Sequence, residues 1–195
     1  MVNLISEATH YAIKQHGNQK YGRKPYHVHL FDVVSVLRRF YDWSELPQPM
    51  VDAAWMHDVI EDTDKTYEEI SFLFGAKTAD LVFAVTNESG DNRKERHKKT
   101  YIKIRETDQA IILKLADRIA NIEQSISFNR VGRRPHNLFF MYLKEWDDFQ
   151  FELRGRCSGE SLIATAMWNH LDMLFELGKK KIEKNETVSD NNKRD

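Results

Sequence analysis

Residues 109–125 form the segment that most constrains what this chain can fold into. Their sequence, QAIILKLADRIANIEQS, places apolar side chains on most of the circumference of a helix. A helix that is apolar nearly all round is usually central in its domain, with other elements packed on several sides. The segment therefore predicts a helical domain built around this helix, with Asp108 as its N-terminal cap.

The same helical spacing of apolar residues recurs along the rest of the chain. It predicts further helices over residues 3–16, 30–40, 50–62, 67–74, 79–86, 137–152 and 160–177. Gly17 and Gly75 are placed to end two of these helices, and Thr66 with Glu69 forms a capping box. Only 8 glycines and 4 prolines occur in 195 residues, which is too few for the turns of a many-stranded sandwich or barrel. We therefore expect an all-α fold.

The length of the chain predicts one domain, because 195 residues suffice for one well-buried core and are few for two. We expect this domain to cover residues 1–178. In residues 179–195, ten of the seventeen residues are charged and two are aliphatic. Such a segment has little apolar surface to bury, so we expect a polar C-terminal tail that is frayed or disordered.

The composition argues against several classes of partner. A formal net charge of −1 gives no basic field for nucleic acid or for a membrane surface. No apolar run approaches the ~20 residues of a membrane-spanning helix. Cys157, the only cysteine, excludes an internal disulfide and a cysteine-ligated metal cluster. The first sixteen residues lack signal-peptide features, so we expect a cytoplasmic protein, and the sequence predicts no oligomeric state.

Polar residues that interrupt apolar helices are the candidate functional residues. His57 and Asp58 are adjacent within the apolar stretch AAWMHDVI, and His29 opens the apolar stretch LFDVV. Asp117 lies among aliphatic residues of the central helix, with Asn121 four residues on and therefore on the same face. Each of them can be a ligand to a cation, and each also fits a structural alternative. The alternatives are an internal hydrogen-bonded pair for His57 and Asp58, a surface ion pair with Arg118 or Lys114 for Asp117, and a helix-start or core histidine for His29.

Taken together, four of these residues favour a metal site. His29, His57, Asp58 and Asp117 provide two imidazoles and two carboxylates on three helices. This donor set suits an Mn, Fe or Zn ion, and it suits Ca²⁺ poorly because Ca²⁺ prefers all-oxygen cages. An ion of this kind can polarise a phosphoryl group and lower the pKa of a bound water towards ~7.

Two acids follow the candidate metal residues along the chain. Glu61 and Asp62 come about one helical turn after His57 and Asp58, so they can face the same cavity. A carboxylate pair there can orient a water and accept its proton. The alternative is a pair of acids at a solvated helix end, where the helix dipole is slightly unfavourable to them.

Basic residues flank the candidate cavity in three polar segments. They are Lys20, Arg23 and Lys24 in the first, Arg93, Lys94, Arg96, Lys98 and Lys99 in the second, and Arg130, Arg133 and Arg134 in the third. Arginine and lysine donors of this sort can hold a polyphosphate. Each run alone also fits a solvated face.

These residues, in this order, resemble the HD-domain metal-dependent phosphohydrolases, whose H…HD…D pattern is met by His29, His57-Asp58 and Asp117. The strings QKYGRKPYHVH, HDVIEDT, VTNESGDNRKER and LKLADRIANI are similar to the hydrolase domain of the RelA/SpoT homologue proteins, especially the small alarmone hydrolases. The resemblance covers residues 3–150. It implies an all-α HD-domain bundle, one Mn²⁺ ion, and hydrolysis of the 3′-pyrophosphate of guanosine tetra- or pentaphosphate to GDP or GTP and pyrophosphate.

The resemblance also implies roles for individual residues. The implied metal ligands are His29, His57, Asp58 and Asp117, and the implied water-activating pair is Glu61 and Asp62. The implied substrate contacts are Lys20, Tyr21, Arg93, Lys94, Arg96 and Asn121. Three places depart from the family pattern. Leu30 stands where a proline is usual, and His27 replaces an aliphatic residue and could compete as a ligand. Arg118-Ile119-Ala120 stands where the family often has arginine or lysine, leucine and a polar or aromatic residue.

Two other hypotheses remain open at the level of the sequence. The chain could be an HD phosphohydrolase for another nucleotide, such as an adenosine 3′-pyrophosphate, a nucleoside monophosphate or a nicotinamide dinucleotide phosphate. It could also be a module that binds a nucleotide or a toxin partner without turnover. The intact pair Glu61 and Asp62 favours an enzyme, because a module that only binds has no need for both.

Overall fold

Helices account for nearly all of the regular structure in the computed structural model, which describes residues 5–42, 44–127, 137–156 and 161–191. The elements run in the order α1 (Glu7–His16), β1 (Lys20–Tyr21), β2 (Lys24–Pro25), α2 (His27–Phe40), α3 (Gln48–Met56), α4 (Val59–Asp62), α5 (Tyr67–Phe74), α6 (Ala76–Val85), α7 (Arg93–Glu106), α8 (Ala110–Ser127), α9 (Asn137–Leu153) and α10 (Leu162–Asn191). The only sheet in these ranges is the antiparallel hairpin of β1 and β2. The predicted all-α fold is confirmed.

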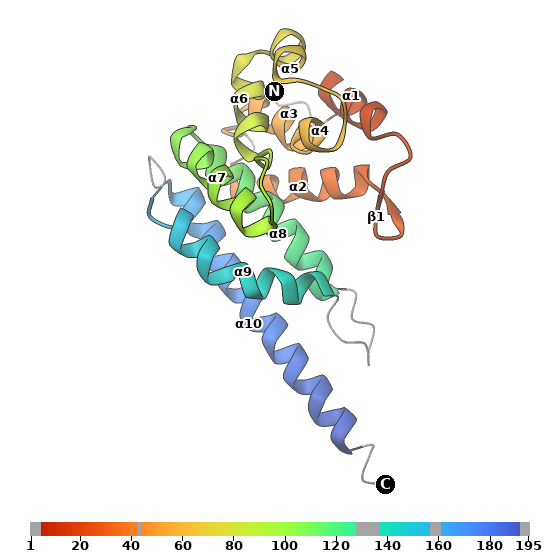
Figure 1. The fold of residues 1–195 in the computed structure, drawn as a ribbon, viewed down its shortest axis with the longest axis vertical. Helices are drawn as coiled ribbons and strands as arrows, with labels where there is room; N and C mark the ends of the chain where they lie inside the picture. The colour runs from red at the N-terminus through yellow and green to blue at the C-terminus, as the bar shows by residue number, and fades with distance from the viewer. Residues whose placement is uncertain (1–4, 43, 128–136, 157–160, 192–195) are drawn as a thin grey trace.

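Helix α8 is the centre of the bundle, as its sequence predicts (Figure 1). Helices α2, α9 and α10 pack on it, and α6 and α7 cover a further side. Leu113, Leu115, Ala116, Ile119 and Ile122 of α8 are completely buried. None of the helices in the described ranges is long and apolar enough to cross a bilayer.

The predicted helix over residues 50–62 is divided in two. Helix α3 ends at Met56 and α4 begins at Val59, and the residues between them are His57 and Asp58. Asp58 has φ −105° and ψ 1°, in the sparsely populated bridge region between helix and strand. Apolar periodicity continues across this break and does not reveal it, yet the break turns both polar side chains out of the helical repeat.

The C-terminal segment also differs from the prediction of a frayed tail. Helix α10 continues past residue 178 to Asn191, and its second half extends away from the other helices (Figure 1). Lysine and glutamate are good helix formers, which accounts for the continuation of the helix through this charged stretch. Lys181 also donates a hydrogen bond of 3.0 Å to the carbonyl oxygen of Ile126 at the end of α8. The boundary of the domain at residue 178 stays a prediction, and the third basic segment, Arg130 to Arg134, lies outside the described residues.

Gly178 of helix α10 lies directly against α9. A Cβ atom placed on Gly178 would lie 2.1 Å from Cζ of Phe139, a phenylalanine of α9 that is completely buried. Only a residue without a side chain allows this contact. The ring of Phe139 in turn lies 5.8 Å from that of Phe175, one turn before Gly178.

We predict that Gly178→Ala lowers the free energy of unfolding by about 1–3 kcal/mol, because the new methyl group forces the buried ring of Phe139 to move. The higher helix propensity of alanine, about 1 kcal/mol, works in the opposite direction. Urea denaturation measures the difference. The control is Lys180→Ala at an exposed position of the same helix, which should change stability by less than about 0.5 kcal/mol. A Gly178→Ala protein as stable as the parent would contradict this packing argument.

Candidate metal centre

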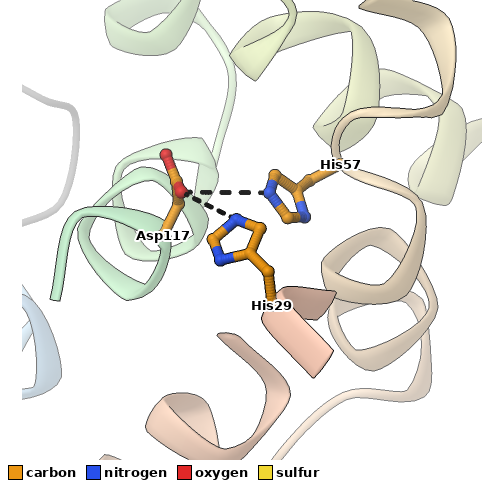
Figure 2. Close-up of side chains that lie close together, drawn as sticks. All are labelled: His29, His57 and Asp117. Atoms are coloured by element: carbon orange, nitrogen blue, oxygen red, sulfur yellow. Dashed lines mark ion pairs between the residues drawn. The ribbon is translucent and has the colours of Figure 1, made fainter. Parts of the chain in front are cut away.

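Three helices bring two imidazoles and a carboxylate together (Figure 2). His29 lies in the first turn of α2, His57 follows the end of α3, and Asp117 lies in the middle of α8. Asp117 Oδ1 lies 3.5 Å from His29 Nε2 and 3.9 Å from His57 Nε2. One ligand atom from each of the three residues lies within 4.8 Å of the other two, which is the spacing of atoms around one metal ion.

Asp58 joins the same cluster. Its Oδ2 lies 2.9 Å from His57 Nε2 and 3.9 Å from His29 Nε2. The Tyr26 hydroxyl donates a hydrogen bond to the same oxygen. The structure therefore brings His29, His57 and Asp117 within mutual reach, and Asp58 lies beside both histidines.

The hydrogen bonds of His57 leave it suited to bind a cation. Its Nδ1 lies 2.9 Å from the carbonyl oxygen of Ala54, which can only accept, so Nδ1 carries a proton, and in the neutral imidazole the lone pair is on Nε2. That Nε2 is buried and, despite its closeness to Asp58, has no hydrogen-bond partner. A backbone carbonyl that fixes the tautomer in this way is a common outer partner of metal-bound histidine. The residues present thus fit the divalent ion that the donor set indicates.

The charges of the cluster also favour binding of a divalent cation. Burial lowers the pKa of His57, but the carboxylates of Asp58 and Asp117 outweigh this and raise it to about 9. Burial raises the pKa of Asp117, and the Lys114 ammonium and the two imidazoles outweigh it and hold that pKa well below its ordinary value. Without an ion, the cluster therefore retains positive charge on His57 between two carboxylates. A divalent cation at the same centre supplies that positive charge instead.

Hydrogen bonds from residues outside the cluster hold the two predicted acids of α4. Glu61 accepts hydrogen bonds from the backbone N–H of Asn87, at 3.1 Å, and from its Nδ2, at 2.9 Å. Asp62 accepts one of 2.8 Å from Gln19 Nε2. These donors come from the segment after α6 and from the segment before β1, so both carboxylates have fixed directions although they are exposed.

A cavity of about 200 Å³ connects the cluster with these acids and with basic side chains. Its lining includes the predicted residues Tyr21, His29, Asp58, Glu61, Asp62, Arg93, Asp117 and Asn121. The Tyr21 ring stacks on His29 at 4.6 Å, and its hydroxyl donates a hydrogen bond to Asn121 Oδ1. Asn121 Nδ2 donates in turn to Asp117 Oδ1 at 2.5 Å, as expected for two residues on one face of α8.

Other predicted residues lie away from this cavity. Lys20 is exposed on β1, and Lys94 forms an ion pair of 2.7 Å with Asp148. Arg96 is exposed, with its Cγ placed against Gly90. His27 is exposed at the first position of α2 and does not line the cavity. Of the second basic segment, only Arg93 lines the cavity, because the first turn of α7 points its side chain inward.

Sequence reasoning missed several residues that line the cavity. They are Tyr26, Asn87, His97, Lys114, Arg118 and Tyr142. Lys114 Nζ lies 3.1 Å from Asp117 Oδ2, three residues further along α8, so the ion pair considered as an alternative for Asp117 does exist, but both side chains are mostly buried. Burial and the nearby charge of Arg93 lower the pKa of His97 to about 3, which keeps its imidazole neutral. In the sequence, Lys114 could be recognised because it lies one helical turn from the candidate ligand Asp117. The sequence offers no such signal for Tyr142, which reaches the cavity only through tertiary packing.

Comparison with known proteins supports this interpretation of the site. The sequence profile of the HD domain matches residues 8–134. The guanosine-3′,5′-bis(diphosphate) 3′-pyrophosphohydrolase of Aquifex aeolicus is 34% identical over 137 residues, covering 67% of this chain and 19% of that protein. The enzyme of the same name, MESH1, from Danio rerio is 30% identical over 123 residues, covering 61% of this chain and 67% of that protein.

A solved structure shares the fold as well. It is that of a metazoan ortholog of SpoT that hydrolyses ppGpp, and it matches with a TM-score of 0.62 and 26% identity, covering 84% of this chain and 93% of that chain. The present chain spans about one fifth of the length of the bacterial relatives that it matches.

We predict that a divalent cation stabilises the protein and that His57→Gln abolishes this effect. Binding to the folded state alone adds about 2.7 kcal/mol at a free ion concentration one hundred times the dissociation constant, or about 5–10 °C in Tm for a chain of this size. Thermal unfolding with and without Mn²⁺ measures the shift. His97→Gln is the matched control, a buried histidine of the same cavity outside the cluster, and it should retain the shift. Equal shifts in both variants would remove His57 from the metal centre.

Proposed function

This chain belongs to the HD-domain family, and we propose that it is a metal-dependent hydrolase of guanosine tetra- and pentaphosphate. The reaction removes the 3′-pyrophosphate and yields GDP or GTP and pyrophosphate. The observation that carries the proposal is the convergence of His29, His57, Asp58 and Asp117 on one centre in a cavity that Glu61 and Asp62 also line. The activity named for the matched relatives supports this choice of substrate.

We propose a single Mn²⁺ ion on those four residues and a cytoplasmic location. When bound, the ion supplies Lewis-acid chemistry on a phosphoryl oxygen and makes a water more acidic. Mixed imidazole and carboxylate ligands support a transition metal of the Mn or Fe kind over Ca²⁺.

Side chains of the protein have the other roles in the proposed reaction. Glu61 and Asp62 orient the attacking water and accept its proton, in directions fixed by Asn87 and Gln19. The water oxygen forms a bond to the phosphorus attached to the ribose 3′ oxygen. The bond between that phosphorus and the 3′ oxygen breaks, and a proton goes to the 3′ oxygen, which leaves as the hydroxyl of GDP or GTP.

The basic wall of the cavity faces the phosphates. Arg93, Lys114 and Arg118 line it, and guanidinium and ammonium donors stabilise charge that develops on phosphate oxygens. Tyr21 and Asn121 form a hydrogen-bonded chain that ends on Asp117, and we assign the ribose to Asn121 and the purine or its phosphates to Tyr21. Substrate must then replace the hydrogen bond that Tyr21 donates to Asn121.

The direct test is a substrate panel. We expect purified protein with Mn²⁺ to convert guanosine tetraphosphate to GDP and pyrophosphate, and to lose this activity when a chelator removes the ion. Adenosine 3′-pyrophosphates, nucleoside monophosphates and nicotinamide dinucleotide phosphates serve as the other members, with separate detection of phosphate and pyrophosphate. Release of orthophosphate alone, or preference for another nucleotide, would overturn the proposed substrate. Binding without product would favour a module that does not catalyse.

We predict that Asp62→Asn lowers turnover by about 10² or more, because the amide cannot accept the proton of the attacking water. The fold and the metal content should stay nearly unchanged, since Asp62 is exposed and is not one of the clustered ligands. Asp64→Asn is the matched control: Asp64 lies two residues further on, is 87% exposed and does not line the cavity. A folded, metal-loaded Asp62→Asn protein with full turnover would exclude the acidic pair from the mechanism.

A further inference from the structure

A second cluster of charges lies beside the metal centre, and it involves a helix beyond the part of the chain matched to the HD domain. Glu145 of α9 accepts a hydrogen bond of 2.6 Å from Nε of Arg93, the first residue of α7. Its other oxygen, Oε2, lies 3.4 Å from Nη1 of Arg118, the residue that follows Asp117 on α8. One carboxylate thus joins two arginines that come from different helices.

Arg118 is an unusual cation because it is only 3% exposed. Its guanidinium carbon lies 4.4 Å from the ring centres of both Tyr142 and Phe149, so two aromatic rings of α9 enclose it. Burial of a charge is costly unless the charge is paired. Glu145 supplies the pairing: burial raises its pKa, but Arg93 and Arg118 outweigh this and lower it below its ordinary value, so the carboxylate is ionised.

The cavity shows which side of this cluster faces a ligand. Arg93 and Arg118 both line the cavity that contains Asp117 and His29, whereas Glu145 lines a separate groove between α7 and α9. The carboxylate therefore holds the two guanidinium groups from behind. Two guanidinium groups and one carboxylate leave a net charge of +1, and their planar forks match the oxygens of a phosphate.

We propose that Glu145 is a positioning residue that holds Arg93 and Arg118 as one phosphate subsite next to the metal centre. The subsite takes the phosphate group of the pyrophosphate that is farther from the ribose. The identity of this ligand rests on the proposed function, but the arrangement of the three charged groups does not. Glu145 itself touches no substrate and acts only through the two arginines.

A second ion pair between the same two helices offers a matched control. Arg105 Nη1 of α7 lies 2.7 Å from Glu152 Oε2 of α9, and Arg105 does not line the metal cavity. Glu145 and Glu152 have nearly the same exposure, 20% and 21%. If Glu145 only joined α7 to α9, replacing either glutamate should have similar consequences. If it positions a subsite, only Glu145→Gln should weaken binding of a phosphate ligand.

The experiment compares Glu145→Gln with Glu152→Gln in the Mn²⁺-loaded full chain. We expect Glu145→Gln to raise KM for guanosine tetraphosphate about tenfold with kcat within twofold, and to weaken binding of inorganic pyrophosphate, measured by calorimetry, by a similar factor. Glu152→Gln should leave both unchanged. In a protein that already carries Arg93→Gln, Glu145→Gln should change KM and pyrophosphate affinity less than it does in the parent protein, because both residues act on one subsite.

The outcomes separate this inference from the proposed function. If the parent protein hydrolyses guanosine tetraphosphate and both glutamine variants keep its KM and pyrophosphate affinity, the positioning role of Glu145 is excluded and the proposed function stands. If no nucleotide is hydrolysed but Glu145→Gln alone weakens pyrophosphate binding, the proposed function falls and the subsite stands. If the Glu145→Gln protein does not fold, the Arg93→Gln protein replaces it in both measurements. Unchanged pyrophosphate affinity in the Arg93→Gln protein would then overturn the subsite.

Discussion

The carboxylate of Asp117 in the middle of the central helix is the constraint on which the rest of the site depends. An ionised side chain at this depth is tolerated only with partners, and they come from several elements: Lys114 and Asn121 from the same helix, His29 from α2 and His57 from the end of α3. Each partner lies where its helix packs on or near α8. Packing of the helices therefore also brings together the side chains of the candidate metal centre.

The cavity is lined by both acidic and basic side chains, and this combination fits the proposed chemistry. Asp58, Asp117, Glu61 and Asp62 supply the carboxylates, and Arg93, Lys114 and Arg118 supply the positive charges. Acids alone would attract a cation without orienting a phosphate, and bases alone would bind a phosphate without activating water. In the proposed reaction, a phosphate ester contacts the cation with one part and the arginines with another, as phosphoryl hydrolysis requires.

The sequence predicted those features that leave a local pattern. Helical periodicity identified the central helix, and the isolated polar residues in apolar stretches identified His29, His57, Asp58 and Asp117. The break between α3 and α4 left no such pattern, because the apolar spacing continues through it. Lys94 and Arg96 could not be told from Arg93 either, since the direction of each side chain depends on where α7 begins. Glu145 and Tyr142 resemble ordinary polar positions of an amphipathic helix until α9 is packed against α7 and α8.

The position of α9 explains why residues outside the HD-domain match contribute to the site. The match ends at residue 134, and α9 begins at Asn137. Its place is set by aromatic packing, with the Trp146 ring 4.1 Å from that of Phe175 on α10, and by the contact of Phe139 with Gly178. The same helix presents Tyr142 and Phe149 to Arg118, and Glu145 to Arg93. The matched segment thus carries the residues of the candidate metal centre, while the packing of α9 and α10 positions the arginines of the cavity.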